Sequence, residues 1–250
     1  MRAMAKTTPR LHLDAALSVN AEIALEKDQG HYLVNVLRHG SGDPVQVFNS
    51  KDGEWLAYIT DATKKSVRIR IEKKLSEATP PPDIDYLFAP IKHQRLDYLV
   101  QKATELGARR LRPIITARTI AERVNLDRMR ANVVEAAEQC NLVFLPEVFE
   151  PIKFDAALRT WDEARTLIFC DETATVSDPL QALEGLKLPL AVCVGPEGGF
   201  TEDERKHLKS LSFVRAIKLG PRIMRADTVA IAALSLVQAK LGDWASSNKS

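Results

Sequence analysis

Apolar and polar residues alternate in the first third of the chain. In residues 66–72 three apolar side chains alternate strictly with charged ones, and shorter runs of similar character occupy 45–48 and 55–60. Strict alternation is typical of a β-strand with one buried face. One helix is expected around 29–37. We therefore predict a small β-barrel-like domain over residues 1–75.

A proline-rich segment at 76–83 separates this region from a second pattern. After it, short apolar runs typical of buried strands alternate with segments of helical periodicity. This alternation predicts an α/β domain over residues 84–245, with a parallel sheet and helices on both faces. The expected strands are 86–89, 111–116, 166–170, 190–194 and 213–219, and the expected helices include 95–106 and 126–140.

Two glycine-bearing segments, 194–204 and 219–228, each follow a predicted strand and precede a predicted helix. Their glycines remove side chains that would keep a ligand away from the backbone. Thr201 begins a capping box that starts the first helix, and Asp227 or Thr228 is expected to cap the second. We predict a pocket in which a small ligand lies against bare backbone.

Composition excludes several classes of protein. The chain has 250 residues, 45% of them hydrophobic, and a net charge of +2. Its three cysteines are scattered and lack metal-ligand spacing, so we expect reduced thiols and no metal. No stretch approaches the roughly 20 apolar residues of a membrane span, and no apolar signal segment follows the N-terminus. We therefore expect a cytoplasmic protein without a membrane partner.

Charge is unevenly distributed along the chain. Residues 92–130 hold ten Lys or Arg against four acids, whereas residues 131–190 hold eleven acids against four bases. A basic block on a nearly neutral protein is what a polyanion-binding face can look like. A solvated surface explains the same pattern, and charge alone favours that explanation.

The glycine segments disagree with the common nucleotide-binding motifs. Neither segment has the Gly-Lys-Ser/Thr ending of a P-loop. A dinucleotide-binding fingerprint would follow the first strand of the domain, whereas both glycine segments lie near its C-terminal end. What remains is a ligand held by backbone amides and carbonyls, with an adenine or similar group in an apolar slot.

Several motifs together resemble a known family. GPEGGFTEDE, LGPRIMRADTVAIAAL, RLDYLVQKATELGARRLRPIITAR, EAAEQC and HYLVNVLR, taken in combination, are similar to the RsmE-type methyltransferases of the SPOUT superfamily. The resemblance implies a PUA-like RNA-binding domain, an α/β domain with a C-terminal trefoil knot, and a homodimer. It also implies S-adenosylmethionine as methyl donor and methylation at N3 of one uridine in the 16S rRNA of the small ribosomal subunit.

The loops and the resemblance together nominate site residues. A carboxylate, Asp227 or Glu197, could take the N3 proton, and Arg118, Arg222 or Arg225 could stabilise the resulting anion. We name Arg225, Asp227 and Arg118 as catalytic candidates. The cofactor candidates are Phe169, Val194, Gly195, Pro196, Glu197, Gly199, Leu219, Gly220, Arg222, Ile223, Met224 and Thr228. The RNA-binding candidates are Arg10, Arg38, Lys92, Arg95 and Arg222.

Two other functions stay open from the sequence. Where the family commonly has Arg-Thr-Glu-Thr-Ala, this chain reads Arg-Ala-Asp-Thr-Val at 225–229. A non-catalytic RNA-binding or ribosome-assembly factor with the same fold would accommodate this change. A SPOUT methyltransferase acting on another RNA would show the same motifs, so substrate choice alone distinguishes it.

Overall fold

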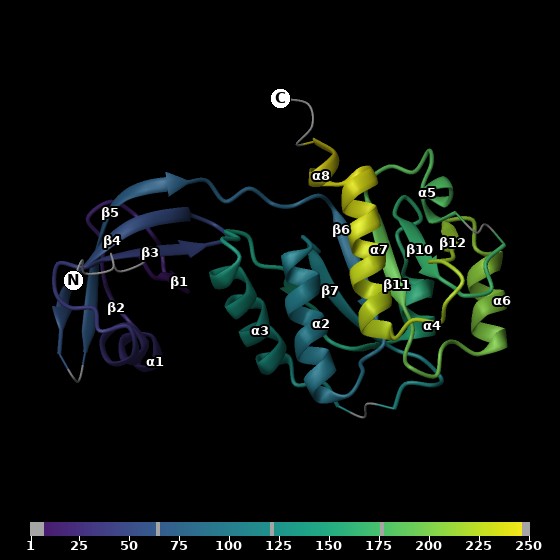
Figure 1. Cartoon of the computed structure of the whole chain (residues 1–250), viewed down its shortest axis with the longest axis horizontal. Helices are drawn as coiled ribbons and strands as arrows, with labels where there is room; N and C mark the ends of the chain where they lie inside the picture. The colour runs from purple at the N-terminus through teal and green to yellow at the C-terminus, as the bar shows by residue number, and fades with distance from the viewer. Residues whose placement is uncertain (1–7, 64–65, 121–122, 176–177, 247–250) are drawn as a thin grey trace. The chain divides into compact units, whose positions relative to one another are not determined.

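The computed structural model describes residues 8–63, 66–120, 123–175 and 178–246. The chain forms two compact units (Figure 1), one of residues 1–80 with 137–145 and one of residues 81–136 with 146–250. The segment 137–145 thus belongs with the first unit, although its sequence pattern continues the second. Lys64 and Lys65, two basic residues just before the alternating segment 66–72, lie outside the described residues.

The first unit is built on a five-stranded sheet with strand order β1-β3-β4-β5-β2. β1 pairs with β3 in parallel, and the other neighbours are antiparallel. Alternate side chains of β5 are buried in one apolar cluster, as the alternation in the sequence predicted. Its strands are β1 (Arg10–His12), β2 (Glu22–Ala24), β3 (Pro44–Asn49), β4 (Gly53–Ala62) and β5 (Val67–Ser76).

The helix expected around 29–37 is two short elements. It begins as α1 (Lys27–His31) and continues as the π-helix η1 (Tyr32–Val36). Arg38 then adopts a left-handed backbone with φ of 59°, which is uncommon for a residue with a side chain. The strand β5 also extends to Ser76, so the connecting segment is shorter than the sequence indicated.

The second unit contains a seven-stranded parallel sheet, ordered β12-β10-β11-β6-β7-β8, with β9 also paired to β7. This confirms the predicted α/β class with a parallel sheet. Its strands are β6 (Ile84–Phe88), β7 (Arg110–Ile115), β8 (Glu147–Val148), β9 (Ile152–Lys153), β10 (Thr166–Cys170), β11 (Leu190–Val194) and β12 (Val214–Ile217). The helices are α2 (His93–Glu105), α3 (Leu126–Gln139), α4 (Phe154–Arg159), α5 (Pro179–Ala182), α6 (Glu202–Ser210), α7 (Ala226–Leu241) and α8 (Asp243–Ser246). Residues 137–139, at the end of α3, belong with the first unit.

Helices cover both faces of this sheet. On one face, Phe154 and Leu158 of α4 and Leu208 of α6 pack in an apolar cluster with strand residues such as Leu87 and Phe169. On the other face, α7 packs against α2 and β11, and Figure 1 shows α2 and α7 side by side across the strands. All five residues of β6 and of β11 are buried, as expected of central strands covered on both faces.

One of the two predicted helix caps is present and the other is wrong. Thr201 Oγ1 accepts the Glu204 amide at 3.2 Å, while the Glu204 carboxylate accepts the Thr201 amide at 2.7 Å, which completes the capping box. At α7 the cap position is Arg225, and no side chain caps the helix. Asp227 lies inside the first turn, where its carboxylate accepts the Thr228 amide instead.

Candidate functional site

A pocket of about 330 Å³ lies at the carboxyl ends of the central strands, where both glycine segments emerge. We call it the glycine-loop pocket. Open parallel sheets bind their ligands at this edge. It is lined by Phe169, Cys170, Glu172, Val194, Gly195, Pro196, Glu197, Gly198, Gly199, Phe200, Arg205, Ile223, Met224, Arg225, Ala226 and Val229. A smaller hollow of about 70 Å³ adjoins it and adds Leu219, Gly220 and Arg222 to the lining.

Gly195 is required by close packing at the first loop. A Cβ atom placed there would lie 2.6 Å from the Phe200 ring, closer than real Cβ contacts allow. Phe200 cannot easily withdraw, because its ring packs against Phe154 at 5.4 Å and Phe169 at 5.1 Å between centroids. Gly199 has φ of 67°, the left-handed region that favours glycine. The loop backbone is therefore fixed and presented to the pocket.

Polar contacts hold this loop from two sides. Arg118 donates to the carbonyl of Gly198 at 2.8 Å. Arg205 of α6 donates through Nε to the carbonyl of Phe200 at 3.3 Å. The second carboxylate oxygen of Glu204 accepts the Ala117 amide at 2.8 Å, which joins the capping box to the loop after β7.

A buried charge network anchors α6 beside the pocket. Asp171 is 2% exposed and forms ion pairs with Lys209 at 2.6 Å and Arg205 at 3.3 Å. The Thr173 hydroxyl also donates a hydrogen bond to its carboxylate. Burial alone would raise the pKa of Asp171, but hydrogen bonds from Lys209 and Thr173 outweigh burial and lower it. Asp171 is therefore a charged anchor for the helix that supplies Arg205 to the pocket.

The nearby cysteines are poor nucleophiles. Burial raises the pKa of the Cys170 thiol to about 12, and burial also raises the pKa of Cys193. A thiol with so high a pKa carries almost no thiolate at neutral pH. Cys170 thus contributes shape to the glycine-loop pocket.

The structure brings together most of the predicted cofactor residues. Phe169, Val194, Gly195, Pro196, Glu197, Gly199, Ile223 and Met224 line the glycine-loop pocket, and Leu219, Gly220 and Arg222 line its smaller neighbour. Thr228 lines neither, and it is an exposed residue of the first turn of α7.

The three catalytic candidates occupy different positions. Arg225 lines the pocket and is exposed. Arg118 donates to the loop carbonyls, so its visible role is to hold the loop. Asp227 does not line the pocket, and Glu197 does. The geometry therefore separates Arg225 and Glu197, which face the pocket, from Arg118 and Asp227, which do not.

Sequence reasoning missed several pocket residues. Cys170 ends β10 and Glu172 follows it, Phe200 precedes α6 and Arg205 lies on it, and Ala226 and Val229 lie on α7. The position of Cys170 and Glu172 just after a buried strand was a usable signal, since ligands gather at strand carboxyl ends. Arg205 carried no local signal.

The RNA-binding candidates differ sharply in exposure. Arg10 is 8% exposed, and its guanidinium donates to Glu54 and to the carbonyls of Ala137 and Leu142 while lying over the Phe48 ring. A direct RNA contact does not fit this burial, and we assign Arg10 a structural role within the first unit. Arg38, Lys92 and Arg222 are exposed, and Arg95 is half-buried on α2.

Two further observations concern metals and membranes. Among residues 8–63, 66–120, 123–175 and 178–246, no three His, Cys, Asp or Glu side chains are grouped as metal ligands. Within the same residues, no helix combines the length and apolarity that crossing a membrane requires.

Comparisons with known proteins agree with this geometry. An RNA methyltransferase domain model matches residues 78–238, and an RNA methyltransferase PUA domain model matches residues 25–72. Ribosomal RNA small subunit methyltransferase E of Rickettsia conorii is 30% identical over 92% of this chain and 94% of its own length. The protein of that name from Bacillus subtilis is 29% identical over 84% of this chain and 87% of its own.

Solved structures give the same assignment. Ribosomal RNA small subunit methyltransferase E from Neisseria gonorrhoeae, solved bound to S-adenosyl methionine, superposes with a TM-score of 0.86. It is 27% identical, and the match covers 95% of this chain and all of that one. A Legionella pneumophila protein solved with the bound cofactor SAM is 28% identical with a TM-score of 0.83, over 95% of this chain and 99% of that one. The chain therefore belongs to the RNA methyltransferase family, and its relatives along nearly the full length are the ribosomal RNA small subunit methyltransferase E proteins.

Proposed function

We propose that this protein transfers the methyl group of S-adenosylmethionine to N3 of one uridine in the 16S rRNA of the small ribosomal subunit. The proposal rests on the glycine-loop pocket. The two segments that resemble the family, 194–204 and 219–228, supply much of its lining at the carboxyl ends of the strands. The cofactor named for the Neisseria gonorrhoeae structure supports the choice of methyl donor.

The residues present fit this cofactor. The volume of about 330 Å³ falls within the roughly 300–1,000 Å³ typical of small-molecule sites. Gly195, Gly198 and Gly199 line the pocket without side chains, so this part of the lining is backbone. The carboxylate of Glu197 lines the pocket and complements a cationic ligand, whereas that of Glu172 pairs with Arg205. When bound, S-adenosylmethionine supplies a methyl group on a sulfonium centre that is already activated for displacement.

The protein must position the uracil and accommodate its charge. The N3 atom carries a proton between two carbonyls, so an imide anion develops as the proton leaves. Arg225 lines the pocket and can donate to a flanking uracil oxygen. The amino end of the 16-residue helix α7 has no side-chain cap and adds partial positive charge on the same side.

A carboxylate is the proposed acceptor of the N3 proton. Glu197 is exposed and lines the pocket, whereas the carboxylate of Asp227 already accepts the Thr228 amide. We therefore infer Glu197 to be the stronger candidate of the two named from the sequence. N3 lies on the Watson-Crick edge of the base, so the uridine must be unpaired or flipped outward before N3 can enter the pocket.

We further propose that the protein works as a cytoplasmic homodimer. Ile223, on the second glycine segment, is 92% exposed although it is a large apolar residue. Several α7 residues, including Ile231 and Leu236, are only half-buried in the single chain. A second copy would remove such apolar surface from water.

The test is methylation of small ribosomal subunits purified from cells that lack the mark. The protein, radiolabelled S-adenosylmethionine and subunits are incubated, and the rRNA nucleosides are separated by mass. We expect 3-methyluridine at one position of 16S rRNA. A methyl group on another nucleotide or on another RNA would show that the proposed substrate is wrong. Cofactor binding without transfer to any RNA would favour a non-catalytic assembly factor.

A further inference from the structure

A second cavity, of about 520 Å³, lies in the same unit and shares no lining residue with the glycine-loop pocket. We call it the amino-end cavity, because its polar lining includes Asp85 and Arg112 in the amino-terminal halves of β6 and β7, and because it lies beside the segment that leads into β10. It is lined by Asp85, Leu87, Arg112, Ile114, Phe149, Glu150, Pro151, Ile152, Ala157, Thr160, Trp161, Asp162 and Arg165. The proposed methyl transfer uses none of these residues.

One side of the cavity is apolar. Leu87 and Ile114 rise from the sheet, and Ala157 of α4 and the Trp161 indole complete the wall. Trp161 is held in place, because its Nε1 donates to the Arg165 carbonyl at 2.8 Å and its ring stacks 6.1 Å from that of Phe213. A fixed indole beside aliphatic side chains is a suitable surface for an aromatic ring.

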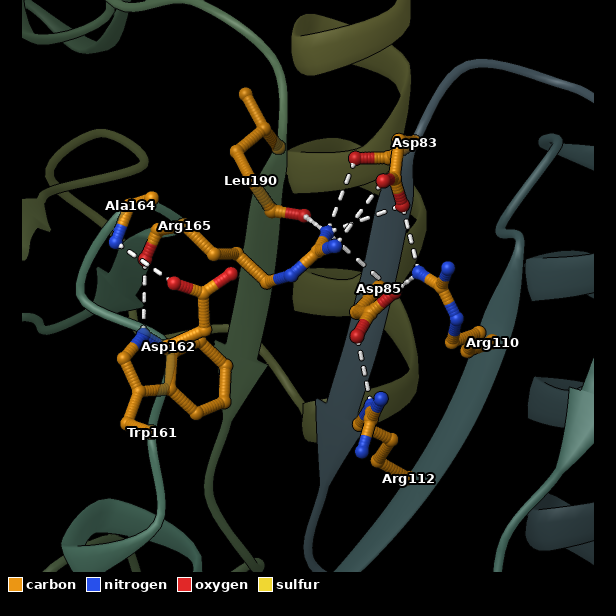
Figure 2. A network of polar contacts seen from close by, with 9 residues as sticks. All are labelled: Asp83, Asp85, Arg110, Arg112, Trp161, Asp162, Ala164, Arg165 and Leu190. Carbon is orange, nitrogen blue, oxygen red and sulfur yellow. Dashed lines mark hydrogen bonds and ion pairs between the residues drawn. The ribbon is translucent and has the colours of Figure 1, made fainter.

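The polar side contains a buried carboxylate surrounded by arginines (Figure 2). Asp85 is 1% exposed and contacts Arg112 Nε at 2.6 Å, Arg110 Nη1 at 2.7 Å and Arg165 Nη1 at 3.6 Å. Asp83 accepts from Arg110 and Arg165 as well. Three guanidinium groups thus face two carboxylates, which leaves one positive charge in the network.

That surplus charge is available at Arg112. Only its Nε is used by Asp85, and its terminal nitrogens have no hydrogen-bond partner among the described residues. The guanidinium lies 4.1 Å from the centre of the Phe149 ring and is 33% exposed. A stacked guanidinium with two free amino groups matches the planar geometry of a carboxylate or phosphate. Glu150 and Asp162, the other acids of the lining, are exposed, so water screens their repulsion.

We propose that the amino-end cavity is a second binding site, which takes a small aromatic anion with its ring against Trp161 and Ile114 and its carboxylate or phosphate on Arg112. The apolar wall and the free guanidinium lie in one cavity, so one molecule can use both. Nucleoside monophosphates and aromatic carboxylates share this chemistry.

The test is calorimetric titration of the full-length protein, saturated with S-adenosylmethionine, with adenosine 5′-monophosphate and separately with indole-3-acetate. We expect at least one probe to bind with a dissociation constant below about 1 mM. Adenosine monophosphate alone would indicate a phosphate ligand, and indole-3-acetate alone a carboxylate ligand. Absence of heat with both probes would overturn the proposal.

Two arginines on the same strand provide a matched pair of variants. Arg110 and Arg112 both pair with Asp85, but only Arg112 lines the cavity. Arg112→Gln should weaken the probe by about tenfold or more, and Arg110→Gln by less than about threefold, because only the first removes a charge-assisted contact to the ligand. Equal weakening in both variants would assign the effect to Asp85 and overturn the proposal.

A third variant addresses the cavity without disturbing its ion pairs. Ala157→Phe places a ring into the space beside Trp161 and should abolish binding of the probe while S-adenosylmethionine binding is retained. Undiminished binding to this variant, or a probe that competes with S-adenosylmethionine, would place the probe elsewhere and contradict the inference.

Discussion

Arginines around the glycine-loop pocket have two different roles. Arg118 and Arg205 donate to carbonyls of the first loop and so hold its shape. Arg222 and Arg225 are exposed and have no partner among the described residues. The guanidinium that lines the pocket and is free to meet a substrate is that of Arg225. Substituting Arg118 therefore tests the shape of the loop, and substituting Arg225 tests the stabilisation of charge on the substrate.

Replacing Arg225 with alanine should lower the single-turnover methylation rate by roughly 10²- to 10³-fold, as loss of one preorganised oxyanion donor does. The affinity for S-adenosylmethionine should change little, because the loop contacts remain. Arg118→Ala should weaken S-adenosylmethionine binding and change the single-turnover rate little, because it removes the hydrogen bond to the Gly198 carbonyl and loosens the first glycine loop. A rate for Arg225→Ala close to that of the unaltered protein would exclude its proposed role.

Asp171 supports a prediction on pH and stability. Its pKa is lowered in the folded protein, since hydrogen bonds from Lys209 and Thr173 outweigh burial, so the charged form favours folding. Asp171→Asn should reduce the free energy of unfolding at pH 7 by roughly 1.5–3 kcal/mol, the range for hydrogen bonds to charged groups. The difference between the two proteins should shrink as the pH falls below the unfolded value of about 3.9.

Urea unfolding of both proteins at several pH values measures this difference. Asp203→Asn is a suitable control, because Asp203 is an aspartate of α6 itself but is exposed. The control should lose no more than about 0.5 kcal/mol. A stability gap at Asp171 that persisted unchanged to the lowest pH would show that its charge is not what anchors α6.

At the scale of elements, the sequence predicted the long and regular parts well. The alternation in β5, the periodic α2 and the capping box of α6 are local signals, and all three elements are present. The three-residue strands β1 and β2 were missed because so short a run has no measurable period. The π-helix η1 also carried no signal, because its hydrogen-bond pattern is not encoded in apolar spacing.

The site was predictable where it is made of contiguous backbone. Both glycine segments line pockets, because bare backbone after a strand is itself the binding surface. Arg205 was missed because its pairing with Glu172 depends on the sheet order, which places β10 beside β11 and brings distant residues together. The trefoil knot, which concerns the path of the whole chain, stays a prediction from the family resemblance.

The first glycine segment supplies a prediction with a built-in control. Gly195→Ala should weaken S-adenosylmethionine binding by about tenfold or more, because the new methyl group meets the Phe200 ring and the loop must move. At Gly198 a Cβ atom would lie 3.5 Å from the nearest Arg118 atom, an ordinary contact, so Gly198→Ala should change affinity by less than about threefold. Calorimetric titration measures both, and equal losses would contradict the packing argument.

On the scale of the whole molecule, the charge pattern takes on a different meaning. Five of the ten bases in the basic block at 92–130 form ion pairs with nearby acids: Lys102, Arg110, Arg112, Arg128 and Arg130. The acids paired with Lys102, Arg128 and Arg130 lie inside the block and are already counted in it, whereas Arg110 and Arg112 pair with Asp83 and Asp85 outside it. Two of the six excess positive charges of the block, ten bases less four acids, are therefore neutralised by other acids of the second unit. On β5, Lys74 pairs with Glu77, whereas the exposed Arg68 and Arg70 have no ion-pair partner among the described residues.

This contrast predicts which arginines determine the salt dependence of RNA binding. Each phosphate contact contributes about 0.7 to 0.9 to the slope of log affinity against log salt concentration. Arg68→Ala should reduce that slope for small ribosomal subunits by about this amount if Arg68 meets a phosphate. Arg128→Ala should leave it unchanged, because Arg128 is equally surface-exposed but is bound by Asp97 through three hydrogen bonds. Filter binding between 50 and 200 mM salt, about the range over which such slopes are read, measures both variants. A slope that fell only with Arg128→Ala would return RNA recognition to the basic block and away from β5.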